Sequence, residues 1–240
     1  MLKFKGYDLK DKGIITDTLP KIQKAKKRID IYEIYGRNGF LSVDNGTYNS
    51  WQLQVECHCS DNADMDEIAA FLDGYGTISF DGIKQSTAIV NNNIEFDKIR
   101  NSGFQKFILS FLVNPIFEDI TPVVETLTFT AGATYYGTTL SVDTNANIYP
   151  DILEINISSD ATIDFNGKSF TLKSGHYFLD CKMKEITDND GDNASGKMDG
   201  NFPYLIDGTN NIKIYNENPT LFKITYRKTY LMGWYYGYRN

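Results

Sequence analysis

The sequence predicts a mainly β protein, with a β-rich N-terminal domain that carries one short helix and a projecting hairpin, and a C-terminal β-sandwich. Aromatic residues make up 14% of the 240 residues, and three of the 19 glycines follow an asparagine. Aromatic residues favour pleated, half-buried strands, and Asn-Gly pairs favour tight turns. Only one segment shows clear helical periodicity. The chain is long enough for one large or two small domains.

The stretch YGRNGFLSVDNGTY, residues 35–48, contains two turn signals close together. Asn38-Gly39 and Asn45-Gly46 are dipeptides that tolerate positive φ at both central positions of a type I′ hairpin turn. Strand-forming residues 40–43 lie between them. We therefore expect the chain to reverse direction twice within about a dozen residues.

The segment 47–59 follows with a strict alternation of period 2, as expected for a strand with one buried face. Further strands are expected at 76–82, 86–92 and 103–115, and Asn114-Pro115 ends this half because proline cannot donate to a ladder. The alternating positions are apolar Trp51, Leu53, Val55, Cys57 and Cys59, and polar Gln52, Gln54, Glu56 and His58.

One helix is predicted from about Met65 to Asp73. The apolar positions 65, 68, 69 and 72 form a single stripe at helical spacing. Asp64 and Glu67 have the spacing of a capping box, and Gly74 supplies the positive φ that commonly ends a helix.

The acidic segment 117–126, which contains Pro122, marks the expected boundary between domains 1–120 and 121–240. Short strands are expected afterwards at 152–158, 161–165, 168–172, 176–186, 211–216 and 221–231, with Asn166-Gly167 as a hairpin turn. Many short strands at regular spacing predict a sandwich.

The charge distribution argues against a nucleic-acid partner, because the net charge is −7 and phosphate binding needs a basic face. Residues 1–30 carry nine Lys or Arg against four Asp, whereas no Lys or Arg occurs between Lys106 and Lys168. The two regions are expected to meet different neighbours, and the basic segment to be solvated or to touch an acidic protein. No membrane span, secretory signal or disulfide framework is expected.

The residues that could take part in catalysis or metal binding form no enzyme motif and imply no cofactor. His58 lies on the polar face of its strand while Cys57 and Cys59 point the other way, so these three do not converge on zinc. His176 is interpreted as a loop histidine. Asp188, Asp190 and Asp192 alternate as at the start of a calcium loop, but Asn193 replaces the required glycine, which favours a solvated loop.

The C-terminal stretch GWYYGYRN forms a candidate contact surface for a glycan or a protein, because aromatic ring faces give large contact areas. An ordinary terminal strand is the alternative. The candidate residues are Trp234, Tyr235, Tyr236 and Tyr238.

The order of these features resembles the distal tail protein (Dit) family of long-tailed, siphovirus-type bacteriophages. A basic segment is followed by a Gly-Arg-Asn-Gly turn, a tyrosine, a long alternating strand, a short helix and a strand leading to Asn-Pro-Ile-Phe. The matching residues are Gly36, Arg37, Asn38, Gly39, Tyr48 and Asn114 to Phe117, and in the second half Asp180, Phe202, Pro203, Leu205, Gly208 and Asn210.

The resemblance implies a structural virion protein, not an enzyme. Six copies would form a ring-shaped hub at the distal end of the tail, with galectin-like C-terminal domains pointing outward. The implied partners are the major tail tube protein, the tail-tip or tail-associated protein, the tape-measure protein and receptor-binding proteins. The implied location is the virion tail tip, after assembly in the host cytoplasm.

Within this resemblance, the residues Arg37, Asn38, Gly39 and Tyr48 are expected at the contact between subunits, where Arg37 would meet a carboxylate of the next subunit. Two other functions stay open. One is a carbohydrate-binding module that contacts the host cell wall, and the other is a β-sandwich hydrolase, which would need a pair of carboxylates in a cleft.

Overall fold

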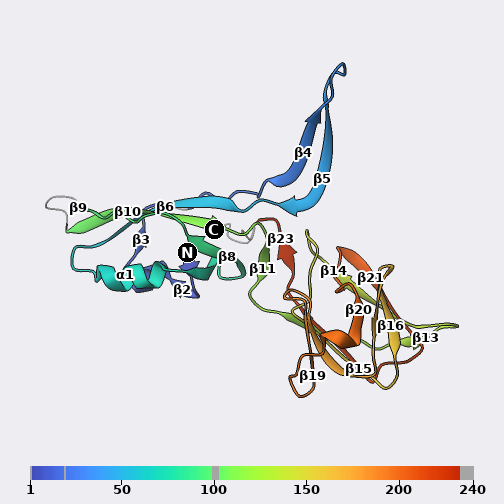
Figure 1. The fold of residues 1–240 in the computed structure, drawn as a ribbon. Coiled ribbons are helices and arrows are strands. Elements are labelled where there is room, and N and C mark those ends of the chain that lie inside the picture. Colours follow the sequence, from blue (N-terminus) through green and yellow to red (C-terminus); the bar gives the residue numbers. More distant parts are fainter. Residues whose placement is uncertain (1, 19, 99–102, 233–240) are drawn as a thin grey trace. The chain divides into compact units, whose positions relative to one another are not determined.

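The computed structural model describes residues 2–18, 20–98 and 103–232 (Figure 1). The described chain divides into two units with the boundary between Ile120 and Thr121, and Leu231 and Met232 group with the first unit. Antiparallel strands dominate both units, so the prediction of a mainly β fold is confirmed.

The first unit contains short and long strands around one α-helix. Its elements are β1 (Lys3–Phe4), β2 (Tyr7–Asp8), a 3-10 turn (Leu9–Lys12), β3 (Ile15–Thr16), β4 (Lys27–Glu33), β5 (Phe40–Tyr48), β6 (Trp51–Ser60), α1 (Met65–Leu72), β7 (Tyr75–Ser79), β8 (Lys84–Val90), β9 (Asp97–Lys98), β10 (Phe104–Val113) and β11 (Phe117–Asp119).

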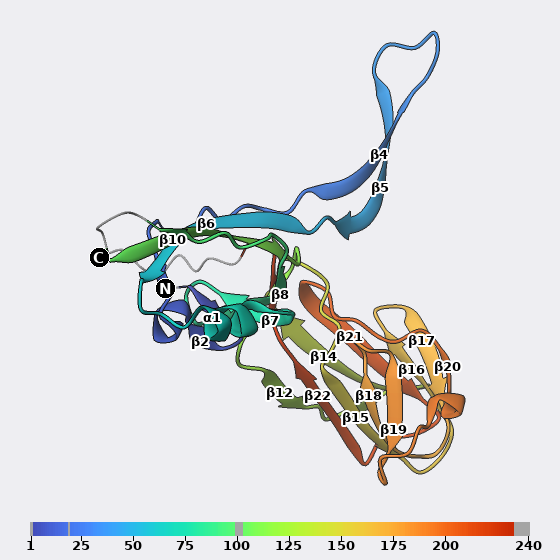
Figure 2. The same cartoon turned by 60° about the vertical axis from the view of Figure 1, so that its left-hand side comes forward.

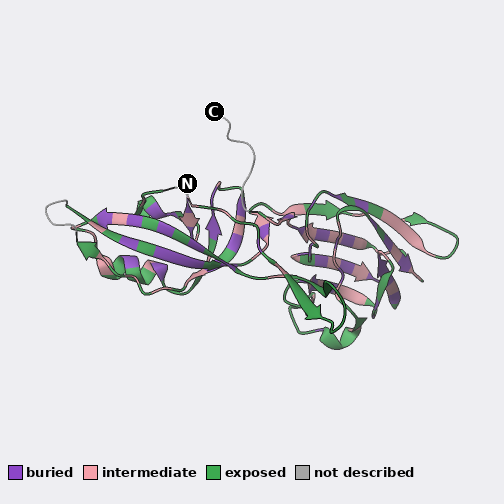
Figure 3. Cartoon of the chain, turned by 90° about the horizontal axis from the view of Figure 1, so that it is seen from above, coloured by how far each residue is buried: buried purple, intermediate pink, exposed green. Residues whose placement is uncertain are grey.

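The centre of the first unit is an antiparallel sheet with the strand order β2-β1-β7-β8-β10-β6-β3. Strands β6 and β10 are each ten residues long and pair along their whole length, from Trp51 opposite Val113 to Ser60 opposite Phe104. Buried residues alternate with more exposed ones along β6, as period 2 requires (Figure 3). The predicted alternation in residues 51–59 is therefore confirmed.

Helix α1 covers the buried face of this sheet (Figures 1 and 2). The ring of Phe4 in β1 lies 5.9 Å from that of Phe71 in α1 and 5.2 Å from that of Phe111 in β10, measured between ring centroids. These aromatic contacts join the helix to the sheet through one core.

The ends of α1 follow the local sequence. The Asp64 carboxylate accepts hydrogen bonds from the backbone amides of Asp66 and Glu67, at 3.0 and 3.1 Å. This satisfies two of the amides that a helix start leaves without a partner. Gly74, two residues after Leu72, has φ +75°. The predicted helix is confirmed, and it ends one residue before the predicted Asp73.

The second unit is built from shorter strands in two sheets. Its elements are β12 (Val123–Thr126), β13 (Thr130–Ala131), β14 (Tyr136–Val142), β15 (Ile152–Ile157), β16 (Ala161–Phe165), β17 (Lys168–Leu172), β18 (Gly175–Asp180), β19 (Glu185–Asp188), a 3-10 turn (Ser195–Lys197), β20 (Met198–Gly200), β21 (Gly208–Tyr215), β22 (Leu221–Tyr226) and β23 (Thr229–Tyr230).

The two sheets, ordered β12-β22-β15-β18-β19 and β13-β14-β21-β16-β17-β20, enclose one hydrophobic core (Figure 2). The ring of Phe165 in one sheet stacks on that of Phe222 in the other, with the centroids 6.2 Å apart. This confirms the predicted β-sandwich. The predicted hairpin turn between β16 and β17 is also confirmed, because Asn166 and Gly167 both have positive φ, at 55° and 85°.

Two of the expected strands were too long. The run 176–186 is divided between β18 and β19, because the Asp180 carboxylate accepts hydrogen bonds from the backbone amides of Lys182 and Met183 and so stabilises a turn. The run 221–231 likewise ends at Tyr226, and β23 follows as a separate short strand.

Candidate subunit interface

Strands β4 and β5 form a two-stranded ribbon that projects from the first unit, and we call residues 27–48 the arm (Figures 1 and 2). Within the described chain, this ribbon is a sheet of its own. Each strand therefore has one edge whose backbone amides and carbonyls face no neighbouring strand. Such edges are ready to pair with another chain.

The arm reverses direction once, so the expected double reversal at residues 35–48 is wrong. The loop 34–39 makes the only turn in this stretch, and the second Asn-Gly pair lies inside β5. There Gly46 has φ +68°, and the register shifts between the pair Lys27–Tyr48 and the pair Ile29–Asp44. The dipeptide forms a β-bulge, which needs the same positive φ as a turn.

The loop itself differs from a two-residue type I′ turn. Glu33 pairs with Phe40, so six residues connect the strands. Among the residues of this loop, Gly36 and Gly39 have positive φ, at 79° and 89°, and Asn38 does not. The loop is closed by a hydrogen bond from the Arg37 amide to the Ile34 carbonyl, at 3.1 Å. The glycines therefore supply the conformational freedom that was expected of the Asn-Gly pair.

Apolar side chains lie on both faces of the arm. Residues that are directly opposite each other in an antiparallel ladder point to the same face. The pairs Ile29–Asp44, Ile31–Ser42 and Glu33–Phe40 define the first face, and the pairs Asp30–Val43 and Tyr32–Leu41 define the second. The first face thus presents Ile29, Ile31 and Phe40, and the second face presents Tyr32, Leu41 and Val43.

These side chains are open to solvent. The exposed fractions are 62% for Ile31 and 65% for Phe40 on the first face, and 52% for Tyr32 on the second. Tyr35, next to the tip, is also fully exposed. Exposed apolar side chains that gather on one surface mark interaction sites. The arm carries three of them on each of its two faces.

Three of the predicted contact residues, Arg37, Asn38 and Gly39, lie together at the tip of the arm and line a shallow hollow of about 590 Å³. All three are exposed. The ion pairs found in the described part of the chain do not include Arg37. Its guanidinium is therefore available for a carboxylate on another chain.

Tyr48, the fourth predicted residue, lies at the root of the arm, opposite Lys27. Nine strand positions separate it from Gly39, which is about 30 Å of extended chain. The structure therefore does not bring Tyr48 to the tip with the other three.

Polar contacts hold the root and the bulge in place. The Lys27 ammonium contacts the Asp44 carboxylate, which also accepts the Gly46 amide at 2.8 Å. These hydrogen bonds, from Lys27 first, hold the pKa of Asp44 below its usual value, and the pKa of Lys27 is raised by the same contact. The Asn45 amide donates to Asp30 across the ribbon, at 3.1 Å.

Sequence reasoning did not find the apolar residues of the arm, which are its main chemical feature. The signal lies in RIDIYEIY, residues 28–35, where isoleucines at 29 and 31 are followed by apolar residues at 32, 34 and 35. Apolar residues at both odd and even positions of a strand occupy both of its faces. The basic residues before this segment obscured that pattern.

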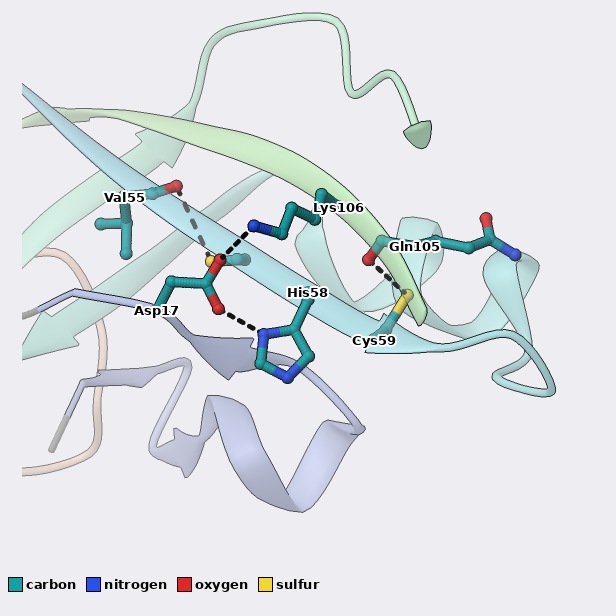
Figure 4. A network of polar contacts seen from close by, with 7 residues as sticks. Asp17, Val55, His58, Cys59, Gln105 and Lys106 are labelled. Carbon is teal, nitrogen blue, oxygen red and sulfur yellow. Dashed lines mark hydrogen bonds and ion pairs between the residues drawn. The ribbon is translucent and has the colours of Figure 1, made fainter. Parts of the chain in front are cut away.

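The histidine and cysteine cluster of β6 forms a structural network (Figure 4). His58 Nδ1 contacts the Asp17 carboxylate, which also lies 4.0 Å from the Lys106 ammonium. Cys57 and Cys59 are buried on the opposite face, as predicted, and burial raises the pKa of the Cys57 thiol to about 12. Such a thiol stays protonated at neutral pH and is a poor metal ligand or nucleophile.

The other two candidates have structural partners as well. His176 lies on β18, not in a loop, and its Nε2 is 3.0 Å from a Glu154 carboxylate oxygen. Asp188 accepts the backbone amides of Asp190 and Asp192, both at 3.0 Å. No group of three or more potential metal ligands was found among residues 2–18, 20–98 and 103–232.

Trp234, Tyr235, Tyr236 and Tyr238 lie outside the described residues, so their role as a contact surface stays a prediction. Within the part of the chain that the structure describes, no helix has both the length and the apolar character needed to cross a membrane.

Comparison with known proteins gives structural neighbours only. No family model and no curated protein matches the sequence. Among solved structures, the Dit protein of phage SPP1, described as a paradigm of the hub adsorption apparatus in phages that infect Gram-positive bacteria, matches with a TM-score of 0.71 and 14% identity. The match covers 95% of this chain and 98% of that one.

A chain of the phage P2 baseplate, in its activated conformation with Ca, matches with a TM-score of 0.46 and 11% identity over 92% of both chains. We base the fold assignment on the SPP1 protein alone. The likeness to that protein extends over both units, so the chain has the Dit fold. The resemblance predicted from the sequence is therefore confirmed at the level of the fold.

Proposed function

We propose that this chain is a structural protein of a phage tail, and that six copies form a ring-shaped hub joining the tail tube to the tail tip. The Dit fold supports this proposal, because the SPP1 protein with that fold is described as a hub of the adsorption apparatus. The hub acts by geometry and performs no chemistry.

The single observation that carries the proposal is the arm. A ribbon with two exposed apolar faces and two unpaired edges leaves much apolar surface and many backbone groups in water. Contact with a neighbouring copy covers the apolar surface and gives the backbone groups hydrogen-bond partners. We infer that the arm docks on a different surface of the next copy; such a contact is heterologous, and a heterologous contact closes into a ring when the rotation fits.

The tip adds specificity to this contact. Arg37, with Asn38 and Gly39 beside it, meets a carboxylate on the adjacent subunit, where a guanidinium binds in a bidentate manner. Tyr48 meets the adjacent subunit at the root of the arm, opposite Lys27. In this proposal residues 1–120 build the ring, and residues 121–240 form a galectin-like domain that points outward.

The proposed partners are the major tail tube protein on one side of the ring and the tail-tip or tail-associated protein on the other. The tape-measure protein ends in the channel, and receptor-binding proteins attach to the outer domains. The uneven charge distribution supports different neighbours on different surfaces. The protein would act at the virion tail tip after assembly in the host cytoplasm.

The experiment compares the intact chain with a variant in which residues 29–44 are replaced by a short Gly-Ser linker. Both are purified alone and with the co-expressed tube protein, and native mass spectrometry gives the number of copies. We expect a ring from the intact chain and monomers from the variant. Equal assembly of the two proteins would show that the arm is not the subunit contact.

A further inference from the structure

The β-sandwich unit contains a cleft of about 790 Å³ that the proposed hub function does not use. Its walls are the β16–β17 hairpin, strand β20 with the loop 201–206, the turn before β19, and the segment before β15. Binding sites for small molecules typically have volumes of about 300–1,000 Å³. The lining residues are Tyr149, Phe165, Asn166, Lys168, Ser169, Lys184, Gly200, Asn201, Phe202, Pro203, Tyr204 and Ile206.

A buried asparagine fixes the walls of this cleft. Asn210 is 0% exposed, and its Oδ1 accepts hydrogen bonds from the Ile206 amide and from the side-chain amide of Asn166, both at 2.8 Å. Its Nδ2 donates to the Ile206 carbonyl at 2.9 Å. One side chain thus ties the loop 201–206 to the β16–β17 turn. A cleft fixed in this way needs little ordering when it binds a ligand.

Two tyrosines provide ring surfaces in the cleft. The centroids of Tyr149 and Tyr204 are 5.7 Å apart with an angle of 48° between the ring planes, and Tyr149 is 42% exposed. Tilted aromatic rings offer large, rigid contact areas with polar hydroxyl tips, and Tyr149 is the more exposed of the two. They suit a ligand whose rings have apolar C–H faces and polar hydroxyl edges, as sugar rings do.

The charge of the cleft is positive although the chain as a whole is acidic. Lys168 and Lys184 reach it from different turns, and no Asp or Glu is among the lining residues. In the described part of the chain, neither lysine takes part in an ion pair, whereas Lys173 and Lys182 of the same unit each contact a carboxylate. The cleft therefore has two cationic groups for an anion.

The backbone and the rings also hold these lysines in place. Lys184 has φ +60°, in the left-handed region that side chains other than Gly and Asn rarely adopt. The Lys168 ammonium contacts the Tyr204 hydroxyl and lies 4.4 Å from the centroid of that ring. Lys184 ends the turn between β18 and β19 and so reaches the cleft from that turn.

We propose that this cleft binds an acidic saccharide, one whose sugar rings carry carboxylate or phosphate groups. The sugar rings pack on Tyr149 and Tyr204, and the anionic groups lie between Lys168 and Lys184. The exposed Asn201 amide is in reach of ring hydroxyls. This site is separate from the arm, and it holds whether or not the chain forms a ring.

Calorimetric titration of the full chain tests the proposal with two acidic probes, trigalacturonic acid and a phosphorylated trisaccharide of the same length. A neutral trisaccharide is the control that has sugar rings without charge. Tri-glutamate is the control that has negative charge without sugar rings. We expect at least one acidic saccharide to bind, and the two controls to bind at least about tenfold more weakly. The two acidic probes distinguish carboxylate from phosphate sources.

Variants locate the site. Lys168→Gln and Lys184→Gln are each expected to weaken binding by about tenfold, the usual effect of losing a charged hydrogen bond. Lys173→Gln removes a lysine of the same unit, directly after β17, that contacts Asp160 outside the cleft, and is expected to leave binding unchanged. All three positions are exposed, so the variants are expected to fold.

Three results would overturn the proposal. One is the failure of both acidic saccharides to bind, and another is equal binding of tri-glutamate, which would show an anion site without preference for sugars. The third is an equal loss of affinity in all three lysine variants, which would show a non-specific charge effect.

Discussion

The first face of the arm offers the sharpest test of how the subunits associate. The double variant Ile31→Ser, Phe40→Ser removes two apolar side chains that are 62% and 65% exposed. They share a face of the ribbon because Phe40 lies directly opposite Glu33, and Glu33 is two positions along β4 from Ile31. Neither side chain belongs to the core of either unit, so the change is confined to the arm.

The expected effect follows from the exposed apolar surface. Full burial of an Ile or Phe side chain stabilises by about 1.5–3 kcal/mol. When this free energy is scaled by the exposed fraction of each side chain, each residue contributes about 1–2 kcal/mol once a neighbouring subunit covers it. The double variant should therefore weaken each contact by about 2–4 kcal/mol, which is roughly a 30-fold to 700-fold lower association constant.

Sedimentation equilibrium over a range of concentrations measures this association. Urea unfolding serves as the folding control, and its free energy is expected to change by less than about 0.5 kcal/mol per site. Met183→Ser, which removes a side chain that is 68% exposed in the second unit, is the matched control and should assemble normally. Assembly of the double variant at the concentrations of the parent would refute the reasoning.

Three further predictions concern stability. Asp64→Ala should lower the free energy of unfolding by about 1 kcal/mol in urea, because it removes the cap of α1, and Asp64→Asn should retain most of it. Leu109→Ala, at a fully buried position of β10, should cost about 2–5 kcal/mol, whereas Leu112→Ala, 40% exposed on the other face of that strand, should cost far less. Because burial raises the pKa of Cys57 from 9.0 to about 12, the unfolded chain loses this proton first; stability should fall as pH rises from about 9 to 12, and Cys57→Ala should reduce that fall.

The elements that sequence predicted well are those whose signal is local. The alternation through residues 51–59 reports one buried face, and β6 has that face. Asp64 and Gly74 mark the ends of α1 by chemistry within one helical turn. Asn166-Gly167 joins two strands that follow each other directly, so its turn needs no distant partner.

The elements that were missed depend on the partner strand. Gly46 has a positive φ within a bulge and not within a turn. The reason is that β4, which begins at Lys27, still pairs with β5 beyond Gly46, at Tyr48. The dipeptide alone does not distinguish a bulge from a turn, since both require the same backbone conformation. The extent of the neighbouring strand decides between them, and that is a long-range property.

The same limit applies to the candidate sites. The tip residues Arg37, Asn38 and Gly39 were placed together by their adjacency in sequence. The two apolar faces became visible only through the β4–β5 register, which sets Ile31 opposite Ser42. The cleft of the second unit depends on Asn210, whose contacts to Asn166 span 44 positions of the chain.

The central claim is that this chain forms a ring-shaped hub, and imaging by negative stain with native mass measurement tests it most directly. The chain is examined alone and with the co-expressed tube and tail-tip proteins. We predict a ring with an open centre and a mass about six times 27.3 kDa for this chain. A strict monomer under all of these conditions would contradict the account.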